Sequence, residues 1–259
     1  MSLSLPEGDG PLRRERLRTA RLYFVCEARP PGDLEALLRA ALTGGADVVQ
    51  LREKELGRAE IERAAGTFRR IADTFSALFI VNDDPELAQR CDADGVHLGQ
   101  DDMSPEEARA LLGPDAIIGL STHTKEQINA AGGGPDQADQ GRRERGVLRT
   151  RATEDADLRR SGPSSSIDYI SVGPIWETPT KEGRPAVGLD LIRHAAAGAP
   201  HPFFAIGGID TGNAAEVVAA GAERLCAVRA IRDAADPEAA AAELRQAFAD
   251  RERGVAPGG

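Results

Sequence analysis

Short runs of apolar and β-branched residues recur along the chain, each bounded by Gly or Pro and separated by stretches rich in Ala, Leu, Glu and Arg. Short runs that are apolar on both faces predict buried parallel strands, and the stretches between them predict helices. The eight predicted strands are 21–27, 47–52, 77–82, 95–98, 116–121, 168–173, 203–207 and 224–229. The predicted helices include 34–43, 58–73, 85–91, 105–112, 189–197, 213–220 and 237–250.

Strict alternation of eight strands with helices predicts an α/β protein with a single (β/α)8 TIM barrel, and a doubly wound open sheet is the alternative. The positions of the polar residues favour the barrel. Gln50, Arg52, Asn82, His97 and Ser121 fall toward the carboxyl ends of predicted strands. In a barrel these ends meet at one mouth, where barrel enzymes hold their catalytic groups.

Three segments lie outside this pattern, so the predicted catalytic domain is 19–250. Residues 1–18 are expected to form a flexible polar arm, and residues 251–259 a C-terminal tail. Residues 132–166 are almost devoid of apolar side chains and predict a disordered insertion between the fifth helix of the barrel and the sixth strand. Connections from helix to strand lie opposite the mouth, so we expect the insertion there, as a solvated tether or a partner-binding loop.

The composition mainly excludes certain classes of function. The chain carries 32 basic and 42 acidic residues, and a net charge of −10 argues against binding to nucleic acid. The three cysteines lie far apart in the sequence and are expected to be small buried residues rather than a disulfide or zinc site. No run approaches the roughly 18 apolar residues of a membrane span, and the N-terminal residues lack the apolar stretch of a signal peptide. We therefore expect a cytoplasmic protein without a membrane partner. The sequence does not decide whether the protein forms a homo-oligomer.

The segment 50–54 ends the second predicted strand and contains one of only three lysines in the chain. Alternate residues of a strand share a face, so Gln50, Arg52 and Lys54 are expected to point to the same mouth. Two cations there are costly unless an anion meets them, and a diphosphate suits the arginine fork and the lysine point charge. The alternative is a rim of salt bridges to Glu53 and Glu55.

Acidic residues follow the third and fourth predicted strands. Asn82 and Asp83 end the third, and Asp102 comes shortly after the fourth. Neighbouring strand ends bring the two carboxylates within reach of one Mg²⁺ ion, which is typically bound by one or two carboxylates together with phosphate oxygens and water. The alternative is that each caps a helix, because Pro85 and Pro105 follow them.

The loop after the sixth predicted strand is long and carries Thr178, Thr180 and Lys181. Two hydroxyls and a lysine are suited to closing over a bound anion, although the loop is equally typical of a connection without function. The seventh and eighth strands end in Gly207–Gly208 and in Val228–Arg229, where barrels commonly hold a phosphate on backbone N–H groups. His97 is expected to have a structural role, and no spacing assembles a hydrolase triad.

Seven motifs taken in order resemble the thiamine-phosphate synthase family. They are QLREK at 50–54, ND at 82–83, GVHLGQDD at 95–102, GLSTH at 119–123, GPIWETPTK at 173–181, AIGGI at 205–209 and AVRAI at 227–231. The resemblance covers residues 20–250 apart from the insertion. It implies a (β/α)8 transferase of thiamine biosynthesis that joins hydroxymethylpyrimidine diphosphate to a thiazole phosphate and releases pyrophosphate with the help of Mg²⁺.

The resemblance also implies roles for individual residues. Those expected to hold the pyrimidine diphosphate are Gln50, Arg52, Lys54, Asn82, Ser121 and Lys181, and Arg52, Lys54 and Lys181 are expected to be catalytic because they face the leaving group. Those expected to hold the thiazole phosphate are Thr178, Thr180, Gly208, Val228 and Arg229, and Asp83 and Asp102 are expected to bind Mg²⁺. The family usually has Ser where this chain has Arg229, and the long insertion is a second departure.

Three other functions compete with this interpretation. A thiazole tautomerase of the same superfamily has no need of a diphosphate and Mg²⁺ site, so retention of Asp83 and Asp102 argues against it. The same carboxylates argue against a non-catalytic thiamine-phosphate sensor. An epimerase or isomerase of sugar phosphates needs an acid/base pair at the substrate carbon, and the sequence offers no obvious pair.

Overall fold

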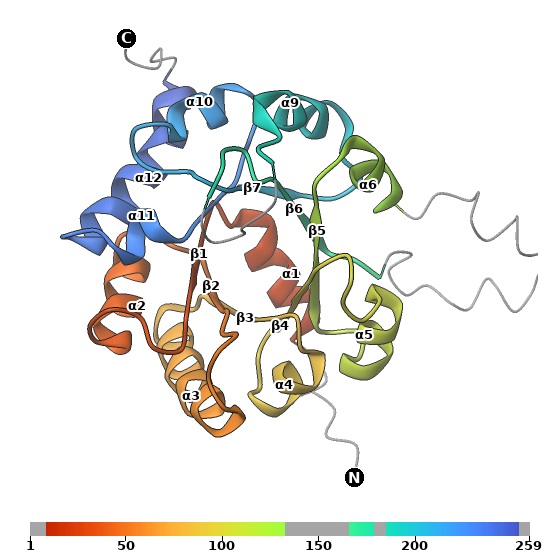
Figure 1. The fold of residues 1–259 in the computed structure, drawn as a ribbon, viewed down its shortest axis with the longest axis vertical. Coiled ribbons are helices and arrows are strands. Elements are labelled where there is room, and N and C mark those ends of the chain that lie inside the picture. Colours follow the sequence, from red (N-terminus) through yellow and green to blue (C-terminus); the bar gives the residue numbers. More distant parts are fainter. Residues whose placement is uncertain (1–8, 133–165, 179–184, 254–259) are drawn as a thin grey trace, which may run out of the picture.

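Eight parallel strands pair in chain order and close on themselves, since β1 pairs with both β2 and β8 (Figure 1). The computed structural model describes residues 9–132, 166–178 and 185–253. The strands are β1 (Leu22–Cys26), β2 (Val48–Leu51), β3 (Leu78–Asn82), β4 (Gly95–Leu98), β5 (Ile117–Thr122), β6 (Tyr169–Val172), β7 (Phe203–Ile206) and β8 (Leu225–Ala227). The predicted (β/α)8 barrel is confirmed.

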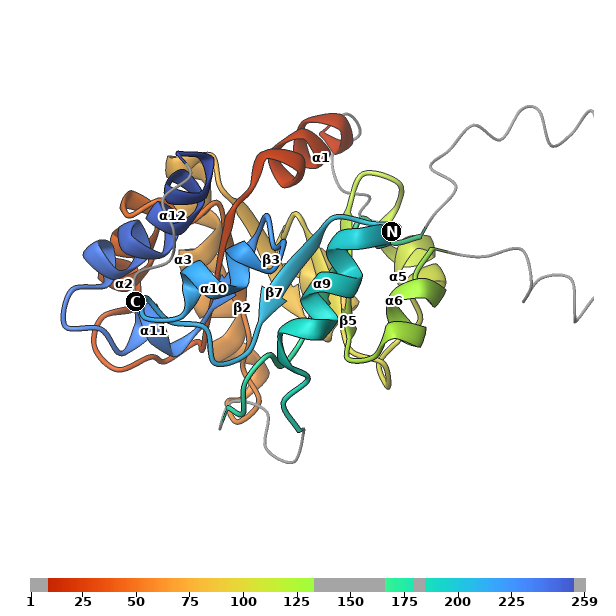
Figure 2. The same ribbon diagram turned by 90° about the horizontal axis from the view of Figure 1, so that it is seen from above.

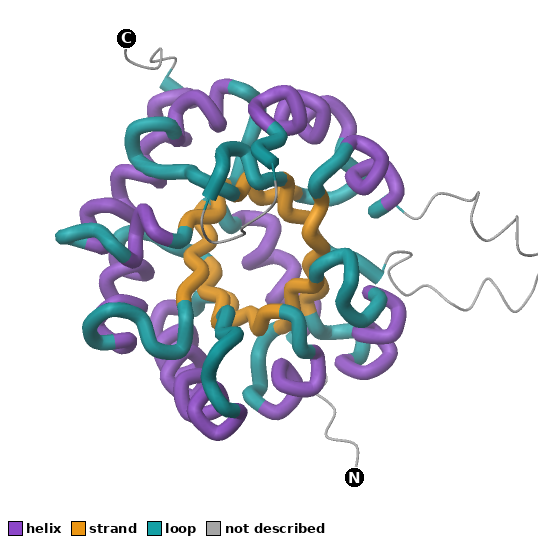
Figure 3. The backbone as a smooth tube through the Cα atoms, in the orientation of Figure 1, coloured by secondary structure: helices purple, strands orange, loops and turns teal. Residues whose placement is uncertain are grey.

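The helices lie around the ring of strands, except that α1 is seen through the middle of the ring (Figure 3). They are α1 (Gly10–Thr19), α2 (Leu34–Thr43), α3 (Arg58–Phe75), α4 (Pro85–Arg90), α5 (Pro105–Leu112), α6 (Lys125–Ala130), α9 (Gly188–Gly198), α10 (Ala214–Ala219), α11 (Arg229–Arg232) and α12 (Pro237–Glu252). Side chains that accept backbone N–H groups fix several helix starts, as Asp33 does for α2 and Asp236 does for α12. The eighth predicted strand was too long, because Arg229 begins α11.

Alternation along each strand divides the apolar core into two clusters. One set of side chains, such as Phe24 and Val49, packs against the surrounding helices. The other set faces the barrel interior and includes Tyr23, Ile80 and Phe204. This two-sided burial is why the strands are almost continuously apolar in sequence.

The expectation of a flexible arm over residues 1–18 is wrong for residues 10–18, which belong to helix α1. This helix lies at the end of the barrel opposite the connection between β6 and α9 (Figure 2), and Leu17 packs into the interior cluster. Arg13 is 5% exposed and pairs with the buried Asp94 at 2.9 Å, while Arg14 pairs with Asp168 at 2.8 Å. Partners far along the chain thus order a segment whose composition is locally polar.

An aspartate precedes each of β2, β4 and β6 and holds the start of the preceding strand. Asp47 accepts from the N–H groups of Arg21 and Leu22, Asp94 from Phe79 and Asp168 from Ile118. Each carboxylate also pairs with at least one arginine, which is Arg245 for Asp47 and Arg109 for Asp168. The position before β8 carries Arg224 instead, which donates to the carbonyl of Arg18 near the end of α1.

The predicted insertion at 132–166 lies almost wholly outside the described residues. Its described ends are Gly132, after α6, and Ser166, before β6, so both belong to a helix-to-strand connection as expected. Ser166 also accepts from Arg109, which pairs with Asp168 at the start of β6. Among the described helices, none is long and apolar enough to cross a membrane.

Candidate active site

A cavity of about 350 Å³ opens at the carboxyl ends of the strands. Its wall is apolar near Val25, Phe204 and Ile206 and polar toward the mouth. The predicted site residues that line it are Gln50, Arg52, Asn82, Thr178, Gly208, Val228 and Arg229. Thr180 and Lys181 lie outside the described residues.

The end of β2 brings an amide and two cations to this mouth. Gln50 is 4% exposed and donates from Nε2 to the Tyr23 hydroxyl at 2.7 Å, while Arg52 lines the cavity without an ion pair in the described part of the chain. Lys54 lies outside the cavity wall, with its Nζ 3.9 Å from Asp83. Glu53 accepts from backbone N–H groups, including that of Lys54, so the salt-bridge rim is not formed at this residue.

Asp83 and Asp102 do not cap helices. Those caps are made by Asp84, which accepts from Leu87, and by Ser104, which forms a capping box with Glu107. Burial, a hydrogen bond with Asp102 and the charge of Asp102 raise the pKa of Asp83 to about 6. Asp83 also has a positive φ of 66°. A carboxylate pair held together in this way favours a bound cation.

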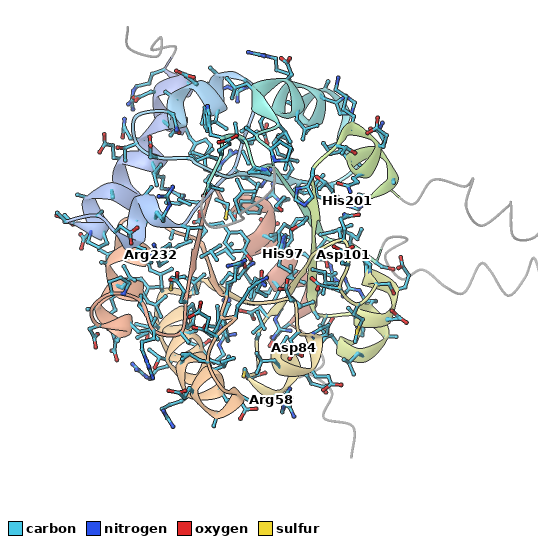
Figure 4. The ribbon with its side chains drawn as sticks, viewed as in Figure 1. Arg58, Asp84, His97, Asp101, His201 and Arg232 are labelled. Atoms are coloured by element: carbon cyan, nitrogen blue, oxygen red, sulfur yellow. The ribbon has the colours of Figure 1, made fainter. Side chains whose placement is uncertain are left out.

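The described residues contain no cluster of three potential metal ligands. A magnesium site does not require such a cluster, because one or two carboxylates are enough when phosphate oxygens and water complete the octahedron. Asp83 and Asp102 fit this pattern of ligands. In Figure 4 Arg58 and Asp84 lie toward the outside of the barrel. Their side chains are 3.7 Å apart, so Asp84 pairs with Arg58 rather than joining Asp83 and Asp102.

The turn after β7 presents its backbone to the cavity. Gly207 and Gly208 have φ values of 104° and 67°, and a Cβ on Gly208 would lie 2.8 Å from Trp176 Cβ. Asn213 donates to the Gly208 carbonyl at 2.8 Å and holds the turn. Arg229 is exposed at the mouth and has no ion pair among the described side chains, because the adjacent Asp233 is held by Arg232.

The sequence argument missed two tyrosines that line the inner end of the cavity. Tyr23 and Tyr169 are the only tyrosines of the chain, and their hydroxyls lie 3.0 Å apart. His97, which lies inside the ring of strands in Figure 4, contacts the Tyr169 hydroxyl through Nδ1 and Ser121 Oγ through Nε2, each at 3.0 Å. Ser121 is therefore behind the cavity wall, and Ser171 lines the wall instead. Alternate residues of a strand share a face. Counting in steps of two from Gln50, and along the neighbouring strands, would have found these side chains.

The family described as thiamine monophosphate synthase matches residues 22–141 and 149–231 of the chain. The chain belongs to the thiamine-phosphate synthase family. The match covers the whole barrel up to α11 and is interrupted only within the predicted insertion. The family resemblance read from the seven motifs is confirmed, and with it the expectation of a transferase of thiamine biosynthesis.

Relatives in this family match over nearly their full length. The thiamine-phosphate synthase of Acidothermus cellulolyticus is 44% identical over 230 residues, which cover 88% of this chain and 94% of that protein. The thiamine-phosphate synthase of Thermus thermophilus is 43% identical over 230 residues, covering 87% of this chain and 96% of that protein. The solved thiamine phosphate pyrophosphorylase from Pyrococcus furiosus has a TM-score of 0.70 at 28% identity, and covers 92% of this chain and 98% of that one.

Proposed function

We propose that this enzyme joins the diphosphate ester of 4-amino-2-methyl-5-hydroxymethylpyrimidine to a thiazole phosphate, forming thiamine phosphate and pyrophosphate. The observation that carries the proposal is one cavity with two separate groups suited to anions. Arg52 and Lys54 follow β2, whereas the Gly207–Gly208 turn and Arg229 follow β7 and β8. Two phosphorylated substrates that react with each other require such an arrangement.

The pyrimidine diphosphate occupies the side of the cavity formed by β2 and β3. Gln50 and Asn82 contact the substrate from the cavity wall, and Ser121 supports the pyrimidine from behind His97. Arg52, Lys54 and Lys181 stabilise the charge that develops on the leaving diphosphate. Arg52 lines the cavity and has no ion pair among the described residues, which supports this role, because a diphosphate suits its guanidinium fork.

The thiazole phosphate occupies the side formed by β7 and β8. Thr178 and Thr180 offer hydroxyls, and the backbone of Gly208, Val228 and Arg229 offers N–H groups. The guanidinium of Arg229 adds a cation where the family usually has a serine. We expect Arg229→Ser to raise KM for the thiazole phosphate several-fold while leaving KM for the pyrimidine diphosphate unchanged, as initial-rate kinetics would measure. Equal changes in both KM values would contradict this role.

The chemistry needs no protein nucleophile. The bond between the methylene carbon and the diphosphate oxygen breaks, and its electron pair leaves with the diphosphate. The electron-rich aminopyrimidine stabilises the positive carbon until the lone pair of the thiazole nitrogen forms the new bond. The protein therefore has to stabilise the leaving group, align the nitrogen and exclude water, and the apolar part of the cavity wall at Val25, Phe204 and Ile206 suits the last task.

Asp83 and Asp102 are the residues that would hold Mg²⁺. When bound there, the ion supplies positive charge to the oxygens of the diphosphate. The position of Lys54, 3.9 Å from Asp83, places a second cation beside the same group. The raised pKa of Asp83 supports the assignment, because a cation between the carboxylates removes their repulsion.

The test is release of pyrophosphate from the pyrimidine diphosphate, thiazole phosphate and Mg²⁺, with each component omitted in turn. We expect release only when all three are present, together with thiamine phosphate in equal amount. Release without the thiazole phosphate would indicate hydrolysis. No release from folded protein that still binds thiazole phosphate would favour the tautomerase or the sensor.

A further inference from the structure

Four side chains form a continuous hydrogen-bonded chain at the inner end of the cavity. Gln50 Nε2 donates to the Tyr23 hydroxyl at 2.7 Å, and that hydroxyl lies 3.0 Å from the hydroxyl of Tyr169. The Tyr169 hydroxyl is 3.0 Å from Nδ1 of His97. These residues come from β2, β1, β6 and β4, so only the closed barrel brings them together.

The chain ends at two serines that contact the other nitrogen of the imidazole. Nε2 of His97 is 3.0 Å from Ser121 Oγ and 3.4 Å from Ser171 Oγ. Ser171 lines the cavity, as do Gln50, Tyr23, Tyr169 and His97. One end of the chain therefore meets a ligand through an amide and the other through a hydroxyl.

Packing holds these groups in place. Tyr23 and Tyr169 are 2% and 0% exposed, and Phe204 packs edge-on against both rings at centroid distances of 5.1 and 5.5 Å. The His97 ring stacks on Tyr169 at 5.4 Å. Gly119 leaves the space that Tyr169 fills, since a Cβ there would lie 2.2 Å from the tyrosine Cζ. Packing thus fixes the positions of the oxygens and nitrogens that form the chain.

In one assignment of the hydrogens, every contact along the chain has a donor and an acceptor. Burial raises the pKa of both tyrosines far above neutrality, so each hydroxyl keeps one hydrogen to donate. Tyr23 accepts from Gln50 and donates to Tyr169, and Tyr169 then donates to Nδ1 of His97. The imidazole is left with its hydrogen on Nε2, which it donates to the serines.

We propose that Tyr23, Tyr169 and His97 are positioning residues that fix the direction of this chain, so that the cavity presents the Gln50 Oε1 acceptor at one edge and the Ser171 hydroxyl donor at the other. Gln50 Oε1 accepts no hydrogen bond from the described residues, and it is the atom left to meet a ligand. A ring that carries an amino group beside a ring nitrogen matches this pattern. A ring with an oxo group and a protonated nitrogen in the same places has the pattern reversed and is rejected.

This inference rests on the proposed function and specifies how the donor substrate is chosen. A site built to hydrogen-bond its ligand discriminates strongly, because a mismatched ligand leaves buried polar groups unpaired. Selectivity for the aminopyrimidine then depends on residues that do not themselves have to touch it.

The experiment compares two donor substrates, the aminopyrimidine diphosphate and its 4-oxo analogue, at a fixed concentration of thiazole phosphate. The ratio of their kcat/KM values is measured for the unchanged enzyme, Tyr169→Phe, Tyr23→Phe and the double variant. We expect each single variant to lower the ratio roughly 10-fold and the double variant to lower it no further, because the chain acts as a unit. The difference in intrinsic reactivity between the two substrates cancels when the ratios are compared, because the same two substrates are used with every protein.

Phe68→Leu is the matched control, because it alters aromatic packing against Phe79 in the outer core, away from the cavity, without removing a hydrogen bond. We expect it to lower the melting temperature and to leave the ratio unchanged. An unchanged ratio of kcat/KM values in both Tyr169→Phe and Tyr23→Phe would overturn the inference. The two tyrosines would then contribute only packing. Failure of the proposed function is separate, since the unchanged enzyme would then release no pyrophosphate from the aminopyrimidine diphosphate.

Discussion

Gly119 illustrates how one residue decides the shape of the cavity. It lies on β5 and pairs in register with Tyr169, whose ring occupies the space a side chain would take. The reason for glycine here is a close approach and not a special backbone conformation. The sequence shows this glycine within GLSTH but says nothing of the tyrosine that lies next to it.

Gly119→Ala is expected to destabilise the protein by about 1–3 kcal/mol, because the tyrosine ring must move within a packed interior. Urea denaturation measures the change. Gly66→Ala is the matched control, since its Cβ meets nothing within 4 Å in the exposed middle of α3, and we expect it to stabilise the protein by about 0.5–1 kcal/mol. Equal effects of the two substitutions would contradict the steric account.

The proximity of Asp83 and Asp102 costs the protein stability when no cation lies between them. The pKa of Asp83 is raised from 3.8 to about 6, so the folded state binds its proton more tightly than the unfolded chain does. Stability from that proton is present below pH 4 and is lost as the pH rises through about 6. At neutral pH the two carboxylates repel each other unless a cation lies between them.

We therefore expect Asp102→Asn to raise the melting temperature at pH 7.5 by roughly 1–2 °C in the absence of metal and to have little effect at pH 4. Asp102 accepts a hydrogen bond from the Gly99 N–H at 2.6 Å, and the side-chain oxygen of the asparagine can accept the same bond. Thermal denaturation with and without Mg²⁺ checks the assignment. The unchanged protein is expected to be stabilised by Mg²⁺, and a similar stabilisation of the variant would argue against this site.

At the scale of elements, a repeated device joins successive strands at the closed end of the barrel. The aspartates before β2, β4 and β6 each hold the start of the preceding strand and an arginine. Asp94 is the most buried of them and pairs with both Arg13 and Arg69 at 2.9 Å. It links α1, α3, β3 and β4, and its loss leaves the buried Arg13 without an ion pair among the described residues, whereas Arg69 keeps Asp73 at 2.7 Å.

Asp94→Asn is expected to lower the free energy of unfolding by about 3 kcal/mol, because breaking a buried ion pair strands the remaining charge. Asp190→Asn serves as the control, since its pair with Arg193 is 87% exposed on the aspartate side, and we expect a change below about 0.5 kcal/mol. Both values come from chemical denaturation. A small effect at Asp94 would show that α1 contributes little to holding this end of the barrel.

The elements were predicted well because their cause is local. The predicted ranges for α2, α5 and β4 coincide with the structure, since capping residues, Pro and alternating burial act within a few residues. Helix α1 was not predicted, because its arginines meet carboxylates more than 80 residues away. Only the first residue of α11, Arg229, was read as strand, because the predicted strand 224–229 ran past the end of β8 at Ala227.

At the scale of the whole molecule, the two ends of the barrel have different tasks. The carboxyl ends of the strands carry the cavity, whereas the opposite end carries α1 and the ion pairs of Asp94 and Asp168 (Figure 2). The predicted insertion joins α6 to β6 and so begins and ends on the side away from the cavity. We therefore expect changes in its sequence to leave the site unaltered.

Replacing residues 133–165 with a short Gly/Ser linker is expected to leave kcat and both KM values within about twofold of the unchanged enzyme. The pyrophosphate-release assay measures all three constants. A larger loss of activity, with the melting temperature preserved, would mean that the insertion takes part in catalysis or in an assembly that catalysis needs.

The sequence by itself determined the barrel, the order of its strands and most of the residues at its mouth. It could do so because burial on both strand faces leaves an apolar run, and the residue that ends each run must point to the mouth. Only the tertiary structure decided which of those residues meet. In the structure Asp83 and Asp102 do not cap helices, and Ser121 lies behind His97. The hydroxyls of Tyr23 and Tyr169 are in contact. Those contacts link strands up to 146 residues apart, and no pattern within a short window of sequence specifies them.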